Sequence, residues 1–118
     1  MQGKRIHYTE IAPKRFDQEP AQGVEGRVLI GKEDGAGKFC MRAFVVEPGG
    51  HTPRHAHDWE HEIFIHAGRG RMLFGEEWKE VEPGCAVFIP GNLTHQIENT
   101  GGESLTVICL IPAGPPEL

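Results

Sequence analysis

Residues 49–68 read GGHTPRHAHDWEHEIFIHAG and hold five of the seven histidines in the chain. His55 and His57 are one residue apart, so both imidazoles project from the same face of an extended strand. His61 follows four residues later, with Glu62 beside it. Neutral imidazole is the commonest protein ligand of divalent first-row metals, so this stretch supplies most of a coordination shell. Taken alone, His55 and His57 fit a patch of solvated histidines equally well.

A second informative passage, residues 84–99, reads GCAVFIPGNLTHQIEN. Pro90 ends a strand, because proline cannot donate to a sheet ladder. Gly91 and Asn92 tolerate a positive φ, so the chain can turn sharply there. His95 then opens the next strand, where its ring can point back towards the first stretch. We therefore expect His95 to complete the histidine set.

The rest of the chain predicts short strands joined by tight turns. Its 16 glycines and 9 prolines are spread along the whole length. Turn signals recur about every eight to twelve residues, which is typical of a β-sandwich or small barrel. No window shows the three- and four-residue apolar spacing of a helix. We therefore expect an all-β chain, with a short β-prone piece at residues 6–11 and strands over residues 24–32, 38–47, 62–67, 71–74, 78–81, 85–89, 94–98 and 105–111.

The last of these strands has apolar residues on both parities. One face carries Leu105, Val107, Cys109 and Ile111, and the other carries Ile108 and Leu110. A strand buried on both faces in so small a domain favours a subunit interface, since an open sheet would leave one face wet. The alternative is an interior strand of a two-sheet sandwich. We expect a homodimer.

Composition and charge exclude several classes of protein. A net charge of −5 without a basic block argues against nucleic acid as a partner. There is no apolar run of about 18 residues to span a membrane, and no apolar stretch follows Lys4 and Arg5 as in a signal peptide. The three widely spaced cysteines predict reduced thiols in a cytoplasmic protein, and without a Cys-x-x-Cys pair they do not predict a structural zinc site.

Together the two passages resemble the two motifs of the cupin superfamily. The first motif, Gly-x5-His-x-His-x3–4-Glu-x5–6-Gly, is matched by Gly49, His55, His57, Glu62 and Gly68. The second, Gly-x5-Pro-x-Gly-x2-His-x3-Asn, is matched by Gly84, Pro90, His95 and Asn99, with its middle glycine one place early at Gly91. The resemblance implies a single jelly-roll (double-stranded β-helix) barrel of roughly six to eight strands over residues 24–112. Residues 1–23 would form an arm that packs on a dimer partner, and residues 113–118 a tail.

The motif leaves the third ligand open between His61 and Glu62. Most cupins use the glutamate, but the four-histidine manganese cupins carry His-x-His-x-Trp-Glu-His-Glu, which residues 55–62 resemble. Proline usually stands there in place of Asp58. The resemblance implies a metal site formed by His55, His57, His61 and His95, with Glu62 as an outer acceptor or as the alternate to His61. The remaining histidines of the first stretch, His51 and His66, are expected at the surface or rim.

Four imidazoles leave an octahedral ion two open positions, which suits Mn²⁺, Fe²⁺, Cu²⁺ or Ni²⁺ better than zinc. The resemblance favours Mn²⁺ and a metal-dependent oxygenase or dioxygenase acting on a small organic molecule. A non-redox isomerase or lyase and a non-catalytic metal- or ligand-binding protein are the alternatives. The expected cavity walls are Phe44, Val46, Ile63, Phe88 and Ile97.

Three further residues are expected beside the metal site. Cys109 is either a thiol open to oxidation near the metal or an inert buried thiol. Arg54 and Trp59 flank the ligands, where they could gate the cavity or pair with a carboxylate.

Overall fold

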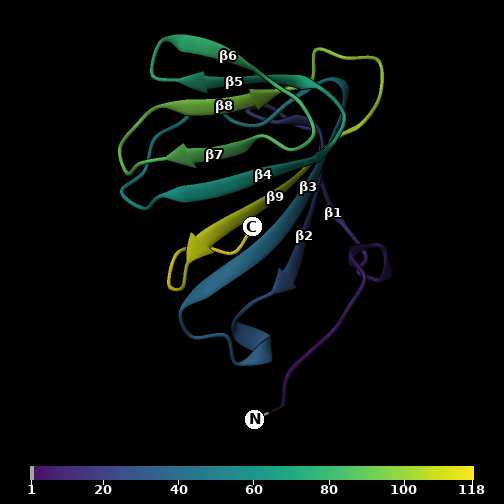
Figure 1. The fold of residues 1–118 in the computed structure, drawn as a ribbon, viewed down its shortest axis with the longest axis vertical. Coiled ribbons are helices and arrows are strands. Elements are labelled where there is room, and N and C mark those ends of the chain that lie inside the picture. The colour runs from purple at the N-terminus through teal and green to yellow at the C-terminus, as the bar shows by residue number, and fades with distance from the viewer. Residues whose placement is uncertain (1) are drawn as a thin grey trace.

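Nine β-strands form within residues 2–118, the part of the chain that this computed structural model describes (Figure 1). The strands are β1 (Lys14–Phe16), β2 (Gln22–Ile30), β3 (Phe39–His51), β4 (His61–Ala67), β5 (Gly70–Phe74), β6 (Glu77–Val81), β7 (Ala86–Ile89), β8 (His95–Glu98) and β9 (Leu105–Pro112). There are also two single 3-10 turns: η1 (Tyr8–Glu10) precedes β1, and η2 (Lys32–Asp34) lies between β2 and β3. Within the same residues, no helix has the length and apolar character needed to cross a membrane.

The strands join into one curled antiparallel sheet in the order β6-β5-β8-β3-β9-β4-β7, with β2 also paired to β3 and β1 paired to β2. The long strand β3 links the β6-β5-β8 part of this sheet to the β9-β4-β7 part. It pairs with β9 from Phe39↔Pro112 to Val46↔Leu105, and with β8 through His51↔Glu98. The result is the predicted all-β jelly roll, curled into a half-barrel.

Strand β3 runs four residues beyond its predicted end at Glu47, across Pro48-Gly49-Gly50 to His51. The chain changes partner there instead of stopping. Gly49 adopts a φ of 80°, and its N–H donates to the Asn99 carbonyl at 3.2 Å. A glycine in this conformation lets a strand bend between two partners. The bend directs the first histidine stretch along β8.

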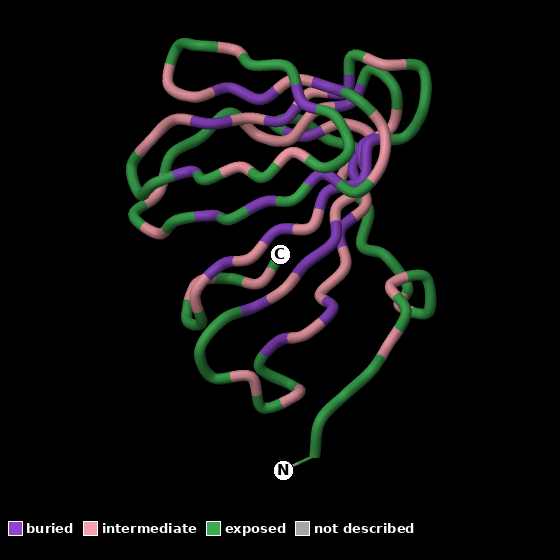
Figure 2. The backbone as a smooth tube through the Cα atoms, in the orientation of Figure 1, coloured by how far each residue is buried: buried purple, intermediate pink, exposed green. Residues whose placement is uncertain are grey.

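Alternation along the strands separates an inner face from an outer face. On β4, every second residue from His61 to Ile65 is buried, and the residues between are exposed. Figure 2 shows the same alternation of buried and exposed positions along the tube. The inward side chains form the core, with Val46, Ile65, Met72, Ile89, Leu105 and Val107 fully buried. Parity along a strand therefore decides which side chains can reach the interior.

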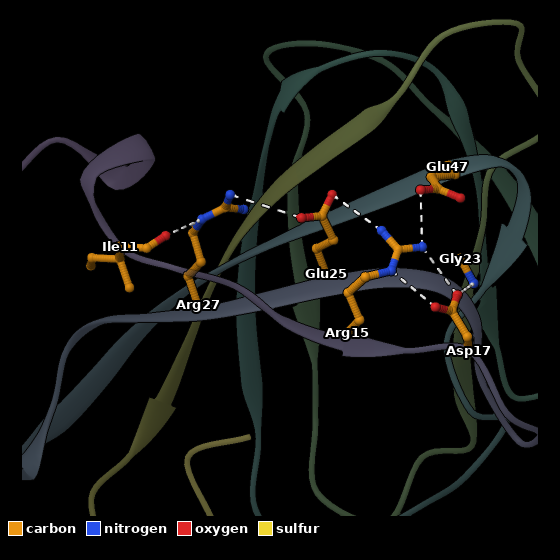
Figure 3. Close-up of polar contacts among 7 residues, drawn as sticks. All are labelled: Ile11, Arg15, Asp17, Gly23, Glu25, Arg27 and Glu47. Atoms are coloured by element: carbon orange, nitrogen blue, oxygen red, sulfur yellow. Dashed lines mark hydrogen bonds and ion pairs between the residues drawn. The ribbon is translucent and has the colours of Figure 1, made fainter.

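The N-terminal arm contacts its own chain. Strand β1 pairs with β2 from Lys14↔Gly26 to Phe16↔Val24. Figure 3 shows Arg15 among the carboxylates of Asp17, Glu25 and Glu47. Its guanidinium nitrogens lie 2.9, 3.6 and 3.0 Å, respectively, from their carboxylate oxygens. These contacts fasten the arm to β2 and β3. Met1, the first residue of the predicted arm, lies outside the described residues, and packing of the arm on a second copy stays a prediction.

The β-prone piece at residues 6–11 does not form a strand. Tyr8–Glu10 form the turn η1 instead. The N–H of Thr9 donates to Nδ1 of His7 at 3.3 Å, and the N–H of His7 donates to the Glu10 carboxylate at 3.0 Å. Such local side-chain caps give the backbone an alternative to sheet pairing. Polar capping residues therefore outweigh the β-prone ends of this segment.

Candidate metal centre

Four histidine rings converge inside the barrel. His55 and His57 lie on the loop between β3 and β4, His61 opens β4, and His95 opens β8. The backbones of His55 and His95 are joined by two hydrogen bonds, of 3.2 and 2.9 Å. The ring centroids of neighbouring pairs within this set lie 4.7–5.0 Å apart. The structure thus brings together the four histidines that the sequence singled out.

Backbone carbonyls orient two of these rings. Nδ1–H of His57 donates to the Trp59 carbonyl, and Nδ1–H of His95 donates to the Leu93 carbonyl, each at 2.9 Å. Each bond assigns the ring proton to Nδ1 and leaves Nε2 with a free lone pair, which is how protein imidazoles are prepared for a metal. Nε2 of His95 is buried without a hydrogen-bond partner. A buried orphan acceptor is costly unless a ligand occupies the site.

The donor set fits a divalent transition metal. One ligand nitrogen from each of His55, His57 and His95 lies within 4.8 Å of the other two. His61 stands beside this trio, with its Nε2 2.8 Å from Nε2 of His57. Because Nδ1 of His57 already carries a proton, the short contact makes His61 the donor. A metal ion bound to Nε2 of both rings would take the place of the proton that His61 donates from its Nε2.

Behind His61, two side chains approach its second nitrogen. Nδ1 lies 3.1 Å from Sγ of Cys109 and 3.3 Å from a guanidinium nitrogen of Arg42. Cys109 comes from β9, so it stands near the histidines, as one of the two predictions for it required. Burial raises the pKa of its thiol, although Arg42 acts in the opposite direction. The sulfur is therefore a neutral thiol at neutral pH, positioned to accept a hydrogen bond from His61 when Nε2 of that ring ligates.

Burial lowers the pKa of three rings of the cluster. Desolvation, with a smaller effect from Arg42, lowers the pKa of His61 to about 3. Desolvation and the neighbouring rings of His95 and His57 lower the pKa of His55 to about 4, although the residue as a whole is exposed at the rim. Desolvation also lowers the pKa of His95. These three rings carry no charge at neutral pH, as metal ligation requires.

Glu62 does not reach the cluster. It follows His61 on β4, projects from the opposite face and is exposed. The assignment in which Glu62 replaces His61 therefore does not fit this structure. Phe88 is also misplaced as a cavity wall, because it lies outward on β7 and is 54% exposed. Strand parity explains both corrections.

The residues expected to flank the ligands differ in what they touch. Trp59 stacks on His57, with ring centroids 4.0 Å apart and planes 6° from parallel. Trp59 therefore fixes the orientation of one ring of the cluster, whereas Arg54 is exposed on the loop. At the neighbouring turn, a Cβ on Gly91 would stand 2.6 Å from the Asp58 carbonyl oxygen. The early position of this motif glycine thus leaves room for the loop that carries Asp58.

An apolar cavity of about 190 Å³ opens beside the histidines. Phe44, Ile63 and Ile97 line it as expected, whereas Val46 is fully enclosed in the core. Arg42, a buried arginine in the lining, was not among the residues expected from the sequence. Its position was the available signal: Arg42 and Phe44 are two residues apart on β3, so their side chains lie on the same face of the strand.

Residues 42–111 match the cupin domain family, and both motifs lie within this range. The chain belongs to this family. The jelly roll and the histidine cluster are thus those of a cupin domain, and in such a domain the cluster suggests metal binding.

Individual relatives carry several different names. The chain is 32% identical over 103 residues to 1-methylthio-D-xylulose 5-phosphate methylsulfurylase of Rhodospirillum rubrum, covering 87% of this chain and 65% of that protein. A polyketide cyclase from Streptomyces resistomycificus has a TM-score of 0.89 and 33% identity, over 98% of this chain and 83% of the other. A cupin-2 domain from Rhodospirillum rubrum has a TM-score of 0.83 and 28% identity, over 94% and 75%. The chain spans 65%, 58% and 49% of the length of three curated relatives.

Proposed function

We propose that this protein is a metal-dependent enzyme that acts on a small organic molecule inside the barrel. The observation that carries the proposal is the convergence of four imidazoles on one point, with the buried Nε2 of His95 left unpartnered. Mn²⁺ is the metal we expect, with Fe²⁺, Cu²⁺ and Ni²⁺ as the other ions suited to nitrogen ligands.

Bound there, the metal would supply a Lewis acid that polarises an oxygen of the substrate. The residues of the chain would orient the histidine rings and surround the substrate with apolar side chains. The carbonyls of Trp59 and Leu93 hold two of the rings, and Trp59 stacks on one of them. Phe44, Ile63 and Ile97 give the cavity apolar walls. A ligand that displaced water there would strengthen electrostatic interactions within it.

Polarisation without a redox step is the chemistry we favour. Two relatives that match most of this chain are called a polyketide cyclase and a methylsulfurylase, and neither name is that of an oxygenase. The second candidate is the metal-dependent oxygenase or dioxygenase. It is supported by the spacing of residues 55–62, which resembles the four-histidine manganese cupins.

Metal binding is tested by comparing His95→Ala with His66→Ala. His66 is an exposed histidine on β4, so its replacement removes an imidazole without touching the cluster. We expect purified wild type and His66→Ala to hold about one metal ion per chain, and His95→Ala to hold none after dialysis. Equal metal content in both variants would contradict the proposal.

The two chemistries are separated by oxygen consumption. Protein loaded with Mn²⁺, Fe²⁺ or Zn²⁺ is mixed with a panel of small aromatic acids and 1,3-dicarbonyl compounds, and both product formation and dissolved oxygen are followed. Turnover that persists with redox-inert Zn²⁺ and without oxygen supports polarisation. Turnover that consumes oxygen and fails with Zn²⁺ supports the oxygenase.

A further inference from the structure

Arg42 is a buried cation with neutral neighbours. The residue is 7% exposed. One guanidinium nitrogen donates to the Glu117 backbone carbonyl at 3.3 Å, and the other lies 3.0 Å from Sγ of Cys109 and 3.3 Å from Nδ1 of His61. The guanidinium carbon is 4.9 Å from the centroid of the Phe44 ring. Nε is buried without a partner.

No carboxylate within residues 2–118 lies at ion-pair distance from Arg42. Glu117 gives it only a backbone carbonyl, while the carboxylate of Glu117 accepts from the N–H of Lys32 at 2.9 Å. Arg15 is the opposite case, because its half-exposed side chain pairs with three carboxylates. Burying a charge without a counter-ion is costly, and natural proteins pair such charges or use them.

The position of Arg42 shows what could pair with it. It lines the same cavity of about 190 Å³ as His55, His61 and His95. The remaining walls are mostly apolar and include Phe16, Phe44, Ile63, Ile97 and Leu118. A ligand that fills this space meets a cation beside the histidines and hydrocarbon elsewhere. The volume is below the range of about 300–1,000 Å³ for drug-sized ligands, so the ligand is compact.

We propose that Arg42 binds the negative group of the ligand, so that the site takes a small organic carboxylate with an apolar body. This deepens the proposed function, on which it rests for the role of the neighbouring histidines. A guanidinium presents planar donors that match a carboxylate, and Nε–H is the donor still free to make such a contact. The ligand would supply the counter-charge that the chain itself lacks.

The test compares an anion with its neutral analogue. Binding of benzoate and of benzamide is measured by calorimetry on metal-loaded and metal-depleted protein, with acetate and pivalate as smaller carboxylates. We expect wild type to bind benzoate at least about tenfold more tightly than benzamide, as a charge-assisted hydrogen bond allows. Arg42→Met should abolish this preference and leave benzamide binding unchanged. Equal binding of the two by wild type, or no binding of any of the three carboxylates, would overturn the proposal.

Matched variants exclude a general effect of charge. Arg27→Met removes one cation from β2, where Arg27 faces Glu25 and Ile11 outside the cavity, and should leave the preference for benzoate intact. If Arg42→Met does not fold, the Nε–H resonance of Arg42 in wild type replaces it. That resonance should shift on addition of benzoate and not of benzamide. An unmoved resonance would overturn the proposal.

Metal content is measured on the same samples, so that the two proposals can fail separately. Stoichiometric metal without an Arg42-dependent preference for benzoate overturns only the role of Arg42. An Arg42-dependent preference in a protein that takes up no metal overturns only the metal-dependent function.

Discussion

The inner and outer faces of β3, β4 and β9 carry opposite chemistry on the same strands. Inward, the three strands bury His61, Arg42 and Cys109. Outward, the next residues along two of them are exposed Glu62 and half-buried Leu110, which are partners in register. The interior of this sheet thus holds three polar groups among its apolar core residues, while apolar Leu110 lies on the outer face beside Glu62. Polar groups inside and apolar groups outside both point to ligands or partners.

The outer face is the second unusual surface. Phe39, Phe64 and Phe88 are 67%, 49% and 54% exposed. Two adjoining hollows on this face share Met41, Glu62 and Leu110 in their linings. The apolar outer parity of β9 was the reason to expect a homodimer. We propose that a second copy of the chain covers this face.

The largest expected effect contrasts neighbours on β4. His61→Ala should lower metal affinity by more than about a hundredfold, since it removes an inward imidazole and its link to Cys109. Glu62→Ala should leave metal affinity unchanged, since Glu62 faces outward. Competition with a chelator measures both affinities. Loss of metal from Glu62→Ala alone would reverse the assignment of the two faces.

A charge on the outer face should break the proposed homodimer. Phe64→Asp places a carboxylate among apolar residues, so we expect sedimentation velocity to show a monomer where wild type sediments as a dimer. Metal content should not change. Glu80→Ala, on β6 at the far end of the strand order, is the control and should stay dimeric. If wild type sedimented as a monomer, the proposal that a second copy of the chain covers the outer face would be wrong.

A smaller effect is expected from the sulfur behind His61. Cys109→Ala removes the acceptor 3.1 Å from Nδ1 of His61 and should lower metal affinity about 10- to 100-fold. Cys85→Ala, which removes a thiol at the edge of the core, should not change it. Metal titration of both variants gives the comparison. Equal affinities would mean that Cys109 only fills space.

The last expected effect is on stability as a function of pH, not on metal binding. The folded, metal-free protein keeps His61 and His95 neutral below pH 6.5, whereas the unfolded chain takes up protons there. The free energy of unfolding should therefore fall with acidification, by up to about 1.4 kcal/mol per pH unit for each ring, until the folded protein is itself protonated. For His61 this end lies near pH 3. Urea titrations between pH 7 and 4 measure the slope, and a flat profile would contradict the burial of neutral rings.

Sequence could predict the fold and the histidines because both are encoded locally. The spacing of the histidines in the loop before β4, and the Pro90–Asn92 turn before His95, indicate the members of the cluster. Arg42 was harder to find. Its parity with Phe44, an expected cavity wall, was an available signal, but apolar residues of the opposite parity on β3, such as Phe39 and Met41, obscure which set faces inward. Which of the two alternating sets of residues faces the interior depends on pairing with strands far away in the sequence. The same dependence explains why Phe88 was wrongly expected to line the cavity.

The central claim is that the histidine cluster holds a transition metal. The most direct measurement is elemental analysis of freshly purified protein, followed by pulsed electron spin resonance of the same sample, reconstituted with Mn²⁺ or Cu²⁺ if needed. The account predicts about one metal ion per chain with nitrogen coupling from several imidazoles. Failure to retain any metal after reconstitution, or a bound ion without nitrogen coupling, would contradict it.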